Sequence, residues 1–83
     1  MSEFKIEFFG VPETKQVEIS KALQSLKPSP DCVEDYSPIV KFQSGKYSIG
    51  YRTSGGVKVL PYEISDTEPA GIAMKLKELL ACW

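Results

Sequence analysis

Basic and tyrosine side chains gather between Tyr36 and Tyr62 of this 83-residue chain. This segment has four basic residues and no acidic residue, although the net charge of the whole chain is −1; the basic residues are Lys41, Lys46, Arg52 and Lys58. Three tyrosines lie among them: Tyr47, Tyr51 and Tyr62. Cations that neutralise phosphates and rings that stack on bases are what a single-stranded nucleic-acid platform needs. The segment therefore points first to nucleic-acid binding.

A second charged segment has the opposite sign. Residues 27–38, KPSPDCVEDYSP, contain three prolines and three acidic residues, Asp31, Glu34 and Asp35. We expect an irregular segment that the prolines hold extended, and a loop of about 12 residues is long for so small a domain. Its acidic side chains are candidates for binding a basic protein surface. The alternative is that they only keep a long connection soluble.

Several kinds of catalytic site are excluded by the composition. The chain has no histidine, so neither a Ser–His nor a Cys–His nucleophile can be built. It has no glycine-rich phosphate loop, because Gly55-Gly56 alone indicates a turn. A chain this short forms one small core and has little room for a deep substrate cavity. We therefore expect a protein that is not an enzyme and has no cofactor.

The two cysteines, Cys32 and Cys82, are too few for a structural zinc site in a chain without histidine. The N-terminal residues contain acids and lack the apolar run of a signal peptide. No stretch approaches the roughly 18 apolar residues of a membrane span. These observations predict a cytoplasmic protein with no membrane partner, in which both cysteines are free thiols rather than a disulfide.

Hydrophobic periodicity predicts the strands and helices that would position these side chains. Residues 4–9 alternate like a strand with one buried face, formed by Phe4, Ile6 and Phe8. Helices are predicted over residues 13–26 and after Pro69. Their apolar stripes are Ile19, Ala22, Leu23 and Leu26 in the first helix, and Ile72, Leu76, Leu79, Leu80 and Trp83 in the second. Phe9, Val17 and Met74 remain as apolar residues on otherwise polar faces.

Residues 39–64 predict a three-stranded antiparallel meander. A two-residue loop at Ser44-Gly45 places Val40, Phe42, Tyr47 and Ile49 on one face. The second turn is ambiguous, because a loop of two residues buries Leu60, Tyr62 and Ile64, and a loop of three turns them outward. We favour the two-residue loop, which buries more apolar surface and avoids placing Arg52 opposite Lys58. A bulge at Pro61 would combine parts of both registers.

This register separates the basic residues from the aromatic ones. Lys41, Lys46 and Arg52 lie on the outer face with Glu63 nearby, and the three tyrosines point toward the helices. A register that exposed Leu60 and Tyr62 beside Lys41 and Arg52 would instead favour a nucleic-acid platform.

The sequence as a whole predicts a single α+β domain over residues 1–83. We expect a two-layer sandwich with a mainly antiparallel four-stranded sheet, two helices on one face and the order β-α-β-β-β-α. Its predicted function is that of a small binding domain that docks on a larger protein as adaptor, regulator or inhibitor. The alternative is a nucleic-acid-binding module that uses the outer face of residues 39–64.

Overall fold

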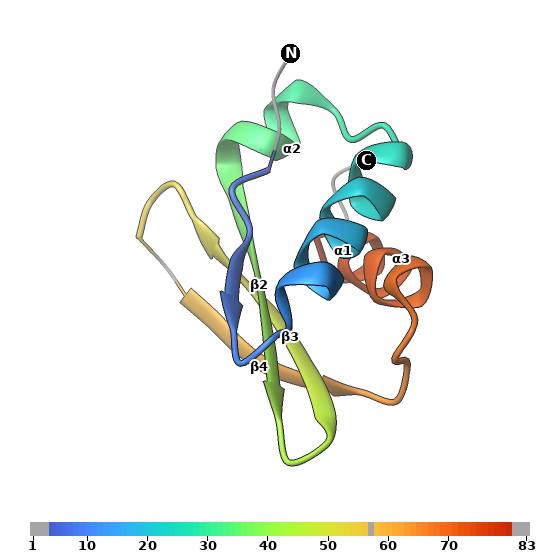
Figure 1. Cartoon of the computed structure of the whole chain (residues 1–83). Coiled ribbons are helices and arrows are strands. Elements are labelled where there is room, and N and C mark those ends of the chain that lie inside the picture. Colours follow the sequence, from blue (N-terminus) through green and yellow to red (C-terminus); the bar gives the residue numbers. More distant parts are fainter. Residues whose placement is uncertain (1–3, 57, 81–83) are drawn as a thin grey trace.

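The described residues form a four-stranded sheet with three helices (Figure 1). The computed structural model describes residues 4–56 and 58–80, and for residues 58–61 it describes the backbone alone. The strands are β1 (Glu7–Phe9), β2 (Tyr36–Gln43), β3 (Lys46–Thr53) and β4 (Lys58–Ile64). The helices are α1 (Glu13–Ser25), α2 (Pro30–Asp35) and α3 (Pro69–Leu80).

The sheet is mixed, with the strand order β1-β2-β3-β4. The strands β2, β3 and β4 form the expected antiparallel meander, whereas β1 is parallel to β2. The parallel pair arises because the chain passes through α1 and α2 before it returns along β2, and such a crossover reverses its direction twice. The α+β prediction is confirmed, with a mixed sheet and an additional helix.

Both long helices lie on the same face of the sheet (Figure 1). Ile19 and Leu23 of α1 and Ile72 and Leu76 of α3 are buried, as their helical spacing predicts. They join the inward-facing sheet residues in one core, which contains Val40, Tyr47, Ile49 and Ile64. Exposure of Phe9, Val17 and Met74 is also confirmed.

The segment 27–38 is not irregular throughout. Residues 30–35 form α2, whose first residue is Pro30 and whose N-cap is Ser29. The Ser29 hydroxyl accepts a hydrogen bond from the backbone N–H of Cys32 at 3.2 Å. A proline in the first helical position loses no intrahelical hydrogen bond, so Pro30 begins a helix here instead of holding the chain extended. The prediction of an extended loop is wrong for these residues.

The first hairpin of the meander is confirmed. Ser44 and Gly45 both have positive φ, 55° and 76°, which is typical of a type I′ turn. Gln43 pairs with Lys46, and Val40 pairs with Ile49. The register that places Val40 and Ile49 on one face is therefore correct.

The second hairpin combines the two registers that the sequence leaves open. Ile49 pairs with Tyr62, as a two-residue loop requires, but Tyr51 pairs with Val59, as a three-residue loop requires. The register shifts between Ile49 and Tyr51, across from Leu60 and Pro61. Proline has no backbone N–H to donate to a neighbouring strand. A residue at a bulge is left unpaired, so it needs no such hydrogen bond. The favoured register is correct at Tyr62 and wrong between the bulge and the turn, where Tyr51 lies opposite Val59. The predicted burial of Leu60 concerns a side chain outside the described part.

Cys32 is buried and disulfide-bonded. The prediction of a free thiol is therefore wrong for this residue. The α2 turn is the local feature that sequence periodicity missed, and it directs Cys32 inward while its acidic neighbours stay exposed. The chain has one other cysteine, Cys82, which lies outside the described residues.

Candidate binding groove

The predicted basic face carries less free charge than its lysines and arginine indicate. Lys46 Nζ lies 3.4 Å from Glu63 Oε1, and Arg52 Nη2 lies 3.4 Å from Glu7 Oε2. Lys41 forms no ion pair with a described side chain, and it is exposed. The face thus combines Lys41, Lys46 and Arg52 with two carboxylates, so that it is only weakly positive.

The tyrosines do not form a stacking platform beside these charges. Tyr47 is buried against Phe42, with ring centroids 4.6 Å apart, and Tyr51 meets Tyr36 edge to face at 5.1 Å. Tyr62 pairs with Ile49 and so lies on the face opposite Lys41, yet it is 57% exposed. Its predicted burial is wrong because β4 is an edge strand and α3 packs mainly over β3.

The acidic residues Asp31, Glu34 and Asp35 share one exposed side of α2. Their spacing of three and four residues places them next to one another on a helix. Within the described ranges, they form no ion pair and no cluster with metal-binding geometry. These carboxylates are exposed, and they line neither of the two hollows described below.

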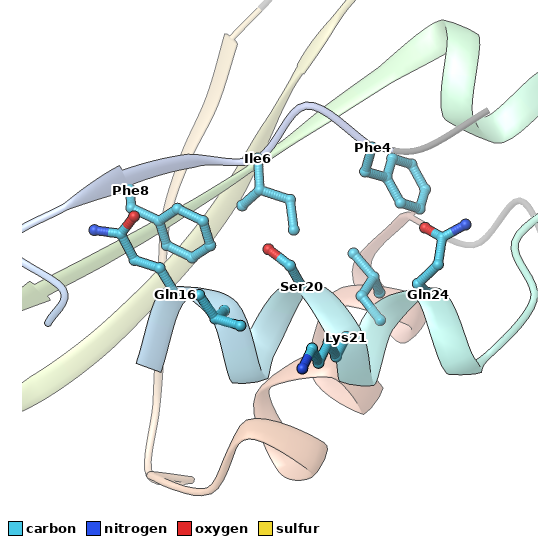
Figure 2. Close-up of a pocket in the computed structure, with 9 residues that line it drawn as sticks. Phe4, Ile6, Phe8, Gln16, Ser20, Lys21 and Gln24 are labelled. Atoms are coloured by element: carbon cyan, nitrogen blue, oxygen red, sulfur yellow. The ribbon is translucent and has the colours of Figure 1, made fainter. Parts of the chain in front are cut away.

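A groove of about 410 Å³ lies between residues 4–8 and α1 (Figure 2). Figure 2 shows Phe8, Ile6 and Phe4 directed toward α1, where Gln16, Ser20 and Gln24 face them in the same order. One wall of the groove is therefore apolar and the other is polar. Its lining is completed by Val17, Lys21 and Leu23.

The groove is open because α1 directs most of its apolar stripe into the core. Ile19 and Leu23 pack above the sheet, and although Leu23 also reaches the groove, the side of the helix over β1 is largely polar. Val17 interrupts that side and is 49% exposed at the groove. The Gln16 side chain is anchored by its Nε2, which donates a hydrogen bond to the Val11 carbonyl at 2.9 Å. The polar wall is thus held in place at the end near Phe8.

The strand that borders the groove has an unpaired side. β1 is the first strand of the sheet and pairs only with β2 among the described strands. In a strand, backbone N–H and C=O groups alternate in direction, so some of those in β1 point away from β2. A free strand edge next to a helix is the geometry in which an extended segment adds to a sheet.

A second hollow of about 300 Å³ lies at the first hairpin and the loop after β4. It contains the Lys46–Glu63 ion pair at its rim and the buried Tyr47 side chain. It lies beside β4, the other edge strand of the sheet, but this edge carries Pro61 and a register shift, which are features that hinder the addition of a further strand. The groove at β1 is consequently the better candidate for binding.

Two signals of this groove were present in the sequence. The alternation of Phe4, Ile6 and Phe8 predicts an apolar strand face, and Val17 stands out on the polar side of its helix. Neither signal shows that the strand is at an edge or that α1 leaves part of it uncovered. No protein-family model matches the chain, and neither a curated protein nor a solved structure matches it.

Proposed function

We propose that this chain is a non-enzymatic binding domain that docks on a larger protein as adaptor, regulator or inhibitor. The observation that carries the proposal is the unpaired edge of β1 beside an apolar groove. In this proposal, the groove receives an extended segment of the larger protein, which adds to the sheet next to β1.

The chemistry of the groove favours a segment with apolar residues at alternate positions. Such residues would lie on Phe4, Ile6 and Phe8, whose own spacing is that of a strand. The polar wall formed by Gln16, Ser20 and Gln24 offers amide and hydroxyl groups to the segment. Lys21 at the rim is exposed and forms no ion pair with a described residue, so it favours an acidic side chain in the segment.

The alternative, a nucleic-acid-binding module, has weaker support. Two of its three candidate cations, Lys46 and Arg52, are ion-paired, and the exposed Tyr62 lies on the other face of the sheet. Phosphate binding at this face would require both ion pairs to open. We therefore favour a protein partner.

The predicted cytoplasmic location is not strengthened by the structure. The disulfide at Cys32 weighs against it, because stable disulfides are rare in reducing compartments. No helix in the described ranges is long and apolar enough to cross a membrane.

The proposal is tested by selecting linear peptides from a random phage-displayed library on the folded domain. Val17→Glu places a charge in the groove, and Met74→Glu is a matched control, because Met74 is an exposed apolar residue of α3 outside the groove. We expect enriched peptides with apolar residues two positions apart. They should bind the wild type and the Met74 variant but lose at least tenfold in affinity on the Val17 variant.

Backbone amide chemical shifts locate the bound peptide. In titrations monitored by heteronuclear NMR, the largest shifts are expected in residues 4–9 and along α1. Selected peptides that instead shift α2 or the outer face of β2 and β3, with equal affinity for both variants, would contradict the proposal.

A further inference from the structure

Three polar residues of α1 face the groove, and one of them has no side-chain partner among the described residues. Gln16, Ser20 and Gln24 follow one another at intervals of four residues, so they form a single stripe on the helix. The Gln16 amide already donates to the Val11 carbonyl, and Gln24 also takes part in an interaction. The Ser20 hydroxyl forms no hydrogen bond with any described group. It is therefore available to a ligand.

The Ser20 hydroxyl is also free of the helix that carries it. A serine inside a helix often bonds the carbonyl four residues before it. Ser25 does so, since its Oγ donates to the Lys21 carbonyl at 2.9 Å, but within the described residues Ser20 makes no such bond. Figure 2 shows its oxygen directed toward Ile6 on the other wall of the groove. The described structure thus gives this hydroxyl no role in holding the fold together.

The side chains around this hydroxyl are mostly apolar. Ile6 and Phe8 lie on the opposite wall, and Val17 and Leu23 line the groove from α1. Ser20 is half-buried, and its oxygen remains accessible to water while the groove is empty. A segment that fills the groove displaces that water, and a hydroxyl that becomes buried without a hydrogen bond weakens binding. The groove therefore disfavours a segment that is apolar at this point.

Contacts with side chains decide the binding at this end of the groove. The pairing of β1 with β2 covers only Glu7–Phe9, and residues 4–6 precede β1 and pair with no described strand. A segment that adds to the edge of β1 and continues past it meets the side chains of Ile6 and Ser20. In strand addition, backbone hydrogen bonds give affinity and side-chain contacts give specificity. Specificity is therefore concentrated between Ile6 and Ser20.

We propose that Ser20 is the specificity-determining residue of the groove and selects a segment with threonine or serine at one position among its apolar residues. The hydroxyl of that residue forms a hydrogen bond with Ser20 Oγ, and the methyl group of a threonine packs on Ile6. Two hydroxyl groups pair readily, because each both donates and accepts. Threonine also favours an extended strand. This inference rests on the proposed function, since it requires an extended segment in the groove.

Parallel selections on the wild type and on Ser20→Ala test the inference. From a random peptide library, the wild type should enrich peptides in which threonine or serine occupies one fixed position among the apolar residues. Ser20→Ala should enrich alanine or valine at that position, because no hydroxyl then needs a partner. Ser25→Ala is the matched control, since Ser25 lies on the same helix outside the groove, and it should select the same peptides as the wild type.

A double-mutant cycle measures the hydrogen bond itself. The tightest wild-type peptide is compared with a version in which valine replaces the threonine, or alanine the serine. On the wild type, the replacement should weaken binding by about tenfold, because the Ser20 hydroxyl is then buried without a partner. On Ser20→Ala, the two peptides should bind within about twofold of each other. Isothermal titration calorimetry gives the affinities, and circular dichroism should show both alanine variants folded, because alanine favours a helix.

The outcomes distinguish this inference from the proposed function. Peptides that bind in the groove without a hydroxyl residue at a fixed position overturn the role of Ser20 and leave the docking function in place. The same holds if the replacement weakens binding equally on the wild type and on Ser20→Ala. If no selected peptide shifts the amide signals of residues 4–9 and α1, the docking function is removed and this inference with it.

Discussion

Arg52 Nη2 lies 3.4 Å from Glu7 Oε2, and this contact joins β3 to β1 across the intervening strand β2. Ile39 of β2 lies on the same face, between Glu7 and Gly50, and is completely buried although α1 and α3 both lie on the other face. Gly50 has no side chain to contribute. The Arg52–Glu7 pair therefore helps to cover Ile39, and Arg52 is a structural residue of the outer face.

Replacing this arginine should destabilise the fold. Arg52→Ala removes the aliphatic stem over β2 and leaves Glu7 Oε2, which is buried and accepts no hydrogen bond within the described residues, without its cation. We expect the free energy of unfolding to fall by about 1–2 kcal/mol, measured by urea denaturation. Lys41→Ala, on the same face, should change it by less than about 0.5 kcal/mol. Equal losses for both variants would show that Arg52 is only a surface charge.

The disulfide at Cys32 leads to a second prediction. Cys32→Ser opens the covalent link between α2 and the rest of the chain, which enlarges the unfolded ensemble. The free energy of unfolding should fall by about 2–4 kcal/mol. Because the chain has only one other cysteine, Cys82→Ser should have the same effect, and reduction of the wild type should reproduce both. Mass spectrometry of alkylated, unreduced protein provides the direct check: free thiols at full occupancy would contradict the bond.

Gly10 connects β1 to the helix that forms the other wall of the groove, and its replacement gives a third prediction. Its φ is +70°, and a Cβ atom there would lie 2.5 Å from the Phe42 carbonyl oxygen. Gly45 has a similar φ of +76°, but a Cβ atom there would have no neighbour within 4 Å. An alanine at this position therefore measures the cost of the positive φ without a clash. Gly45→Ala should destabilise by about 1 kcal/mol, and Gly10→Ala by about 1–3 kcal/mol more. Thermal unfolding of both variants measures the difference, and equal midpoints would contradict the predicted clash.

Elements with a strong period were predictable from the sequence. The stripes of α1 and α3 and the alternation of the first hairpin place Ile19, Ile72 and Val40 in the core because each periodicity allows one buried face. The helix α2 was not predictable in this way, since six residues are too few to show a period. The available signal was a serine at the N-cap position, Ser29, followed by a proline at the first helical position, Pro30.

The candidate site was less predictable, because its character depends on contacts between distant residues. The sequence identified Lys46 and Arg52 as outward-facing, but it could not show that Glu63 and Glu7 would meet them. The pairing of Arg52 with Glu7 requires β1 to lie beside β2, and hydrophobic periodicity does not specify which strands become neighbours in a sheet. The groove depends on the same arrangement, since it exists only where α1 stands over an edge strand.

The edge position of β4 gives the last prediction, which compares two tyrosines that share the helix-facing side of the sheet. Tyr47 lies in the core and is 4% exposed, whereas Tyr62 lies beyond the helices on the edge strand. Tyr47→Ala should cost about 3–5 kcal/mol, and Tyr62→Ala less than about 1 kcal/mol, in urea denaturation. Ile49→Ala, at the strand position opposite Tyr62, is the control for that part of the sheet and should also cost several kcal/mol. A cost for Tyr62→Ala as large as that for Tyr47→Ala would mean that Tyr62 is buried, which would contradict its exposed position on the edge strand.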